Sequence, residues 1–296
     1  MVEAAAVLAA FEDGSLPLAA WDHRQHLRAA YACLAGDDAF ARFRAALLAY
    51  NARHGFVQTD TGGYHETMTR SFLRVMARCV QELPTGLAPT AVQACVVGMC
   101  ADKRMLLRHY QRETIMGLPA RRGWVEPDLV PLEAPPDRTI RPYTVADRAA
   151  VIACVAALQE HLRSSAPWLL PGDAMAAVYL EHLVTTCAAR EGALYVAVQG
   201  GEVVGLACVW IERDFEALES ALTQVAYVSD LVVLPAARGG GLGHMLLATC
   251  EEHALLAGVA HVQLTVLAGN PRAHALYARE GYEDMRLLLR KELGRA

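Results

Sequence analysis

The chain has 296 residues, of which 54% are hydrophobic and 20% are charged, and its formal net charge is -5. This length is about twice that of a typical domain, so we expect two domains, each large enough to bury a core. The composition is that of an ordinary folded chain and excludes wholesale disorder. With 27 basic and 32 acidic residues, no large basic field indicates a nucleic-acid partner or an anionic membrane surface.

The cysteines and the apolar segments indicate the compartment. The eight cysteines lie in apolar runs without a Cys-x-x-Cys pair, which predicts buried, reduced thiols. The apolar segment 1–11 contains Glu3 and lacks the basic start of a signal peptide. The apolar run 91–101 is too short to span a bilayer. We therefore expect a cytoplasmic protein that has no membrane partner.

Residues 1–116 show helical patterning. Apolar side chains recur at spacings of three and four in segments 40–50, 67–80 and 91–109, which predicts a helix in each. Turn signals rich in glycine, proline and aspartate separate these segments. We expect four or five helices packed as an all-α bundle, which forms the first domain.

Histidines interrupt the apolar pattern of this first domain. His23 and His26 are three residues apart, so both project from one face of a helix, and His65 follows in a second polar motif. If the helices converge, the three imidazoles could hold a divalent metal. A buried hydrogen-bonded histidine network and a site for a non-metal ligand remain open as alternatives. The two motifs also resemble a bacterial helical domain, a resemblance that implies no activity.

Residues 117–137 contain five prolines, and this density predicts a linker. From residue 138 onward strands and helices alternate, which predicts a second domain over 138–296 with a mixed sheet. The expected strands are 139–142, 194–199, 203–212, 225–234, 261–267 and 284–291, and the expected helices are 145–164, 174–190, 243–257 and 271–280.

The sharpest local signal is an apolar strand that leads through Arg238 and three glycines, 239–241, into a helix. Glycines let the backbone pass close to a ligand, and the free N–H groups of a helix start attract phosphate. Arg238 adds a guanidinium that can bind phosphate through two N–H groups. A dinucleotide fingerprint would need glycine where His244 stands, and no Walker loop is present. A tight turn without a ligand is the alternative.

The motif Arg238-x-x-Gly241-x-Gly243 is similar to the acetyl-coenzyme A pyrophosphate loop of the GNAT superfamily of N-acetyltransferases. Downstream, the segment from Asn270-Pro271 to Gly281-Tyr282 resembles the second conserved block of that superfamily. Upstream, Ile140-Arg141-Pro142 and Asp147 resemble its first strand and helix start. The resemblance extends from about Arg138 to Glu292. It implies an α/β (α+β) domain with a mixed, mostly antiparallel central sheet.

The resemblance also implies a cosubstrate, acetyl-CoA, and roles for particular residues. Backbone groups of Val232 and Val233, on a splayed strand, would hold the pantetheine and polarise the thioester carbonyl. Tyr277 would protonate the departing thiolate, although a packed amphipathic tyrosine is the alternative reading of that residue. The full set expected at the cosubstrate is Val232, Val233, Arg238, Gly239, Gly240, Gly241, Gly243, His244, Asn270, Ala273 and Tyr277.

Acidic residues around the strands are candidates for the remaining chemistry. Asp230 lies on the strand beside the expected thioester site and could accept the proton of the amine, and Glu212 ends the preceding strand. Asp214 and Glu216 precede the strand that begins at Val225, where a negative cluster could attract a cationic acceptor. A solvated or structural carboxylate is the alternative for each of them.

The sequence therefore predicts an acyltransferase that moves an acetyl group from acetyl-CoA to the primary amine of a small molecule or peptide by direct attack. Cys208 and Cys250 lie in apolar patterns without a histidine partner, so a covalent carrier is not expected. One alternative is an acyl-CoA sensor whose helical domain binds a ligand or a metal. Another is a metal-dependent enzyme in the helical domain. The amine is not readable from the sequence, and we expect a monomer or a homodimer.

Overall fold

The computed structural model describes residues 4–213, 224–286 and 288–289. The chain forms two compact units, Met1–Thr265 and Val266–Ala296. The first unit holds the N-terminal helices together with a five-stranded sheet, and the second holds one further helix. The domain boundaries expected at residues 116 and 137 both lie inside the first unit, so this division of the chain does not separate the two expected domains. The boundaries stay predictions.

The N-terminal region is helical, as the spacing of its apolar residues predicts. Side-chain caps define several helix starts: Asp22 accepts a hydrogen bond from Gln25 N at 2.9 Å, and Asp38 accepts one from Ala41 N at 2.9 Å. The helices are α1 (Ala4–Asp13), α2 (His23–Cys33), α3 (Ala39–Arg53), α4 (Glu66–Glu82), α5 (Pro89–Met99), α6 (Arg112–Met116) and α7 (Leu118–Arg122).

The helix expected over 91–109 is shorter than predicted, because α5 ends at Met99. The Asp102 carboxylate accepts a hydrogen bond from Arg104 N at 2.9 Å, a local turn that competes with helical bonding. A short 3₁₀ segment, Met105–Arg108, follows this turn.

The sheet is mixed and mostly antiparallel, as expected. Its strands are β1 (Arg138–Pro142), β2 (Ala193–Gln199), β3 (Glu202–Glu212), β4 (Val225–Val233) and β5 (Val262–Leu264), and they lie side by side in chain order. The first four pair antiparallel, and β5 pairs parallel to β4. A hairpin turn at Gly200 and Gly201, both with positive φ, joins β2 to β3, where the sequence predicts it.

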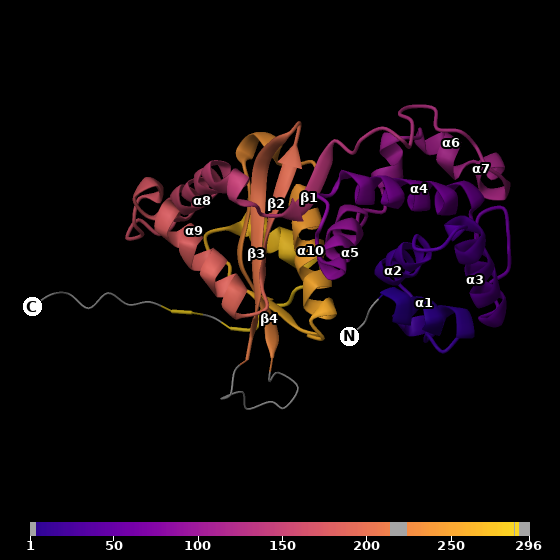
Figure 1. Cartoon of the computed structure of the whole chain (residues 1–296), viewed down its shortest axis with the longest axis horizontal. Helices are drawn as coiled ribbons and strands as arrows, with labels where there is room; N and C mark the ends of the chain where they lie inside the picture. Colours follow the sequence, from indigo (N-terminus) through magenta and orange to yellow (C-terminus); the bar gives the residue numbers. More distant parts are fainter. Residues whose placement is uncertain (1–3, 214–223, 287, 290–296) are drawn as a thin grey trace, which may run out of the picture. The chain divides into compact units, whose positions relative to one another are not determined.

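Helices cover both faces of this sheet (Figure 1). On one face lie α8 (Arg148–Arg163) and α9 (Gly172–Ala189), which bury apolar side chains against β2 and β3. On the opposite face lies α10 (Leu242–Leu256), and beyond it the N-terminal helices continue the same buried cluster. Near the start of the sheet region, Arg141 of β1 forms a bidentate ion pair with Asp147, in which both N–O distances are 2.7 Å.

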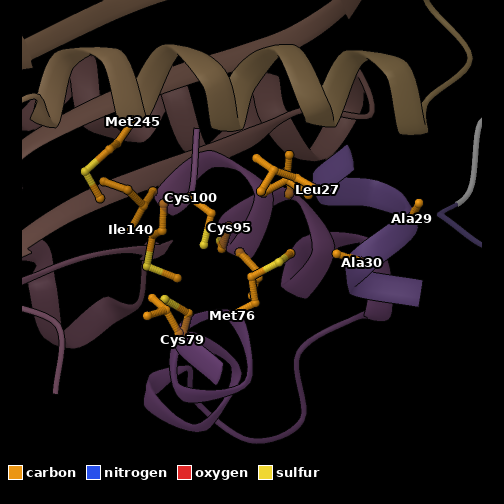
Figure 2. Packing of buried hydrophobic residues seen from close by; sticks show 14 of the residues in the cluster. Leu27, Ala29, Ala30, Met76, Cys79, Cys95, Cys100, Ile140 and Met245 are labelled. Carbon is orange, nitrogen blue, oxygen red and sulfur yellow. The ribbon is translucent and has the colours of Figure 1, made fainter. Parts of the chain in front are cut away.

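The N-terminal helices join the sheet through α5, which packs directly against α10. The crossing is close at Gly98, where an added Cβ would lie 2.0 Å from Thr249 Oγ1. Figure 2 shows Cys95 of α5, Met245 of α10 and Ile140 of β1 in one packed cluster. Because the helical region and the sheet share this core, they form a continuous hydrophobic interior.

The proline-rich segment 117–137 packs against the helical region. Thr67 Oγ1 donates to Gly123 O at 2.6 Å, and Leu132 is 1% exposed. Arg108 binds Asp137 at 2.6 Å, which ties the end of the segment to the 3₁₀ turn.

In the second unit, α11 (Pro271–Arg279) begins at the predicted Asn-Pro motif and ends before Gly281, whose φ is +90°. The strand expected over 284–291 is not present at the described positions 284–286 and 288–289. A strand needs a hydrogen-bonded neighbour, and the described sheet ends at β5.

All eight cysteines are free and buried, and their burial confirms what the apolar runs around them predict. Across the described ranges, no helix combines the length and apolar character needed to cross a bilayer.

Candidate active site

The candidate site is built on β4, whose two halves have different neighbours. Its first half pairs with both β3 and β5, but the pairing with β5 covers only Ala226 to Val228. Within the described sheet, the half from Ser229 to Val233 therefore has β3 as its one neighbour. The result is an open strand edge with unpaired backbone groups, the kind of edge on which an extended ligand can form strand-like hydrogen bonds.

The pairing pattern decides which peptides face this open edge. Leu234 N donates to Val204 O at 2.8 Å, and alternate residues of an antiparallel strand point their N–H and C=O groups the same way. The backbone of Val232 is therefore directed to β3, and the backbones of Leu231 and Val233 are directed away from it. Of the two valines expected to hold the pantetheine, Val233 thus presents its backbone to the open edge, and its neighbour there is Leu231.

The glycine-rich turn follows directly at the end of β4. Gly239 and Gly241 both have φ of +86°, a conformation that favours glycine over any other residue. Gly241 occupies the N-cap of α10, and no side chain caps that helix. The first N–H groups of a helix have no partner within it, so the start of α10 offers uncapped donors where the helix dipole is positive. Gly243 and His244 lie in this first turn.

Two arginines shape the glycine turn. Arg238 Nε donates to Val233 O at 2.8 Å, which leaves its two terminal nitrogens without a hydrogen-bond partner in the described chain. Arg138 of β1 donates to Gly240 O, and an added Cβ at Gly240 would lie 2.6 Å from the Arg138 guanidinium. The turn is therefore held open from both sides, with the Arg238 guanidinium free to meet an anion.

Asp230 lies at an irregularity in the middle of β4. The pairing shifts between Cys208 and Val209 of β3, so Ser229 is an extra residue in β4 and forms a β-bulge beside Asp230. The Asp230 carboxylate is 7% exposed, and burial raises its pKa above the usual aspartate range. Bulges commonly re-aim side chains next to active sites.

Two hydroxyl groups hold the Asp230 carboxylate. Tyr179 Oη of α9 donates to its Oδ2 at 3.1 Å, and Ser229 Oγ donates to the same oxygen at 2.7 Å. These hydrogen bonds, together with the nearby His182 of α9, lower the pKa of Asp230 and partly offset the effect of burial. The arrangement keeps a carboxyl with a raised pKa in a fixed position, a property expected of a general base.

The other acidic candidates divide into two groups. At the end of β3, the Glu212 carboxylate accepts hydrogen bonds from Trp210 Nε1 at 3.0 Å and from Arg190 at 3.3 Å. These two bonds give Glu212 a structural role there. Glu212 pairs with Val225, at the end of β4 away from the glycine turn. Asp214 and Glu216 lie outside the described residues.

The residues expected from the second conserved block lie in the second unit. The Asn270 side chain accepts a hydrogen bond from Ala273 N at 3.2 Å and caps α11, with Pro271 at the first helical position. Tyr277 lies on α11, and its ring centroid is 5.8 Å from that of Tyr282. The local structure that the sequence predicts for this motif is therefore present.

The sequence left a divalent-metal site at His23, His26 and His65 open as one of three possibilities, and the described residues do not form one. Across the described ranges, no group of three His, Cys, Asp or Glu residues could hold a metal ion. His65 Nδ1 accepts a hydrogen bond from Met68 N at 3.2 Å, so that lone pair is already used to cap α4. The three histidines instead line one cavity within the helical region.

Sequence reasoning missed several residues of the site. Tyr179 lies on a helix without a recognisable motif, and Ser229 and Leu231 look like ordinary strand residues. Arg138 meets the glycine turn from the far end of the sheet domain, at a separation of 102 residues. No local pattern could have found these residues, because each acts through a contact made in the folded chain.

The mostly antiparallel sheet, the open edge on β4 and the uncapped glycine turn into α10 agree with the fold that the resemblance to the acetyltransferases implies. Residues 155–282 match the model of the acetyltransferase (GNAT) family, which covers less than half of the chain.

Among curated proteins, the chain is 36% identical over 98 residues to aminoalkylphosphonate N-acetyltransferase of Salmonella typhimurium strain LT2. That stretch covers 33% of this chain and 61% of the relative, so the chain spans less than two thirds of the relative's length.

The comparison with solved structures also found chains that are similar to part of this one. One is a transcriptional regulator from Bacillus halodurans C-125, with 23% identity and a TM-score of 0.43, covering 53% of this chain and 99% of that one. Another is an aminoglycoside N-acetyltransferase in complex with CoA, with 18% identity and a TM-score of 0.42, covering 52% of this chain and 94% of the other.

Proposed function

We propose that the protein is an N-acetyltransferase that transfers the acetyl group of acetyl-CoA to the primary amine of a small molecule. The observation that carries the proposal is the open half of β4 leading into the uncapped glycine turn of α10. An extended pantetheine arm fits the edge, and a pyrophosphate fits the turn.

The residues of the turn fit the cosubstrate in charge and in shape. An added Cβ at Gly239 would meet nothing within 4 Å, so the backbone there is open to a ligand. The Arg238 guanidinium supplies positive charge beside the free N–H groups of α10. We assign the pyrophosphate to Arg238, Gly239, Gly241 and Gly243, and the pantetheine amides to Leu231 and Val233.

The proposed reaction converts a thioester into an amide and moves two protons. The amine nitrogen attacks the thioester carbonyl carbon, the C–N bond forms, and the C–S bond breaks. Asp230 accepts the proton that the amine loses, and the departing thiolate takes a proton from the hydroxyl of Tyr277. The N–H of Leu231, which lies farther from the glycine turn than Val233, is our candidate donor to the carbonyl oxygen as negative charge develops there.

For the acceptor we propose a chemical class, a small molecule with a primary amine. The curated relative is named for aminoalkylphosphonates, so (aminomethyl)phosphonate is the first amine to test, followed by an amino acid, a polyamine and an aminoglycoside.

The test is release of free CoA thiol from acetyl-CoA by the full chain, measured with each amine, together with calorimetric titration of acetyl-CoA. Tight binding with amine-dependent thiol release supports the proposal. Binding without release on any amine points to the alternative, an acyl-CoA sensor. Absence of binding would overturn the assignment of the glycine turn.

A further inference from the structure

A cavity of about 380 Å³ lies within the helical region, between α2, α3 and α4. Its wall is largely aromatic and apolar and includes Trp21, Phe43, Phe56, Met68 and Phe72. Folded interiors pack closely and rarely leave voids much larger than a water molecule, whereas small-molecule sites commonly have about 300–1,000 Å³. The volume of this cavity lies within the range of small-molecule sites.

Two histidines of α2 bring polar atoms to this wall. His23 Nε2 lies 3.3 Å from Cys100 O, and His26 Nδ1 lies 2.7 Å from Asp22 O. A carbonyl oxygen can only accept, so in each ring the named nitrogen carries the proton. The other nitrogen, His23 Nδ1 or His26 Nε2, then carries a lone pair and has no hydrogen-bond partner in the described chain.

The cavity favours an uncharged occupant. Burial lowers the pKa of His23 to about 4, and burial also lowers the pKa of His26, so neutral imidazoles line the cavity at neutral pH. The residues of the wall include no aspartate or glutamate that could balance a cation. Placing an unpaired charge against such a wall is unfavourable.

We propose that this cavity binds an uncharged, mostly apolar aromatic alcohol, whose hydroxyl donates a hydrogen bond to His23 Nδ1 or His26 Nε2. The ring packs against Trp21, which already contacts His26 in a tilted arrangement with ring centroids 3.7 Å apart. The proposal is independent of the acetyltransferase activity, because it uses residues of the helical region only.

The experiment titrates the full chain with two probes of similar shape, para-fluorophenol and para-fluorotoluene, and follows their binding by fluorine NMR. Both probes offer a ring to the aromatic wall, but only the phenol can donate to an imidazole. We expect saturable binding of both, with the phenol bound about tenfold more tightly because of the hydrogen bond. Equal affinity for the two probes would contradict hydroxyl recognition, and no saturable binding would overturn the site.

Substitutions in the cavity wall test whether the probes bind there. Asn51→Trp places a large side chain in the wall and is expected to abolish binding of both probes. Val178→Trp is the matched control, because Val178 lies on α9 and is 75% exposed. The double variant His23→Phe/His26→Phe is expected to equalise the two affinities, with circular dichroism as the check on folding. Unchanged phenol preference in a folded double variant, or unchanged binding in Asn51→Trp, would overturn the proposal.

Discussion

Single residues set the protonation chemistry of the candidate site. Asp230 is buried on β4, where its surroundings raise its pKa, and two hydroxyls fix the orientation of its carboxyl group. A carboxyl in this state can accept a proton only when it is ionised. The rate of acetyl transfer is therefore expected to fall as the pH decreases through the raised pKa of Asp230.

Asp230→Asn is expected to lower kcat by about 10²–10⁴-fold with acetyl-CoA affinity nearly unchanged, because the amide keeps the shape but cannot accept the proton. Calorimetry and steady-state rates across pH separate the two effects. The acidic limb of the pH profile should disappear in the variant. Tyr179→Phe is the companion variant, and it should shift that limb while most of the rate remains. Full activity in Asp230→Asn would remove this residue as the base.

Asp147 makes the free energy of unfolding depend on pH. Hydrogen bonds from Arg141 hold its pKa at about 2, below the unfolded value of 3.8. A depressed carboxyl pKa contributes stability above the unfolded value, and this contribution is lost as the pH falls from about 5 to about 2. We expect Asp147→Asn to lose about 2 kcal/mol at neutral pH and little at pH 2. Urea unfolding at both pH values measures the difference, and an equal loss at both would contradict it.

At the scale of elements, glycines decide how closely the backbone approaches its neighbours. Gly241 adopts positive φ where α10 begins, and Gly98 lets α5 cross α10 without a side chain between them. The two glycines act in different ways. One keeps a ligand surface open, and the other brings two helices into contact.

Gly241→Val is expected to abolish acetyl-CoA binding, because a branched side chain would fill the path of the pyrophosphate and disfavour the backbone conformation. Gly86→Val is the matched control. Gly86 has φ of +82° and open space around it, so it carries the same backbone strain in the helical region. Both variants should lose similar stability in thermal unfolding, but only Gly241→Val should lose binding. Retained affinity in that variant would contradict the loop assignment.

Gly98→Val is expected to destabilise the fold by about 3 kcal/mol, because the added atoms would overlap Thr249 and force α5 away from α10. Gly36→Ala provides the control, since its Cβ would meet only Cys33 O at 3.6 Å. Urea denaturation measures the free energy of unfolding of both variants. A Gly98→Val protein as stable as the Gly36→Ala control would show that α5 and α10 can move apart without a loss of stability.

At the scale of the whole molecule, a buried ion pair connects the helical region to the sheet. Arg28 of α2 and Glu252 of α10 are 3% and 0% exposed, and Arg28 Nε donates to Glu252 Oε2 at 2.9 Å. Gln93 Nε2 of α5 donates to the same carboxylate at 2.8 Å. Three helices from distant parts of the sequence therefore share one polar network inside a hydrophobic core.

Arg28→Met is expected to destabilise the chain by about 3–5 kcal/mol, because Glu252 would stay buried without its cation. The double variant Arg28→Met/Glu252→Met removes both charges and should recover much of that loss. Chemical denaturation of the three proteins measures the coupling between the residues. A double variant that loses the sum of both single effects would contradict the buried pair.

Much of the fold could be predicted because its signals are local. The apolar runs of β2 and β3, the glycines of their hairpin and the Asn-Pro start of α11 each depend on neighbouring residues, and the structure places all of them as expected. The α5 helix was predicted too long, because a side-chain turn at Asp102 outweighs its helical pattern.

The amino-acid order alone was enough to identify the strand, the glycine turn and the helix that follow one another at residues 225–256, since their chemistry lies in adjacent residues. Asp230 was likewise a candidate from its position on the strand. The contact of Asp230 with Tyr179, the peptides that face the open edge, and the cavity lined by the three histidines became visible only in the folded chain. These features arise from pairing and packing between distant segments, and such contacts leave no local pattern in a single sequence.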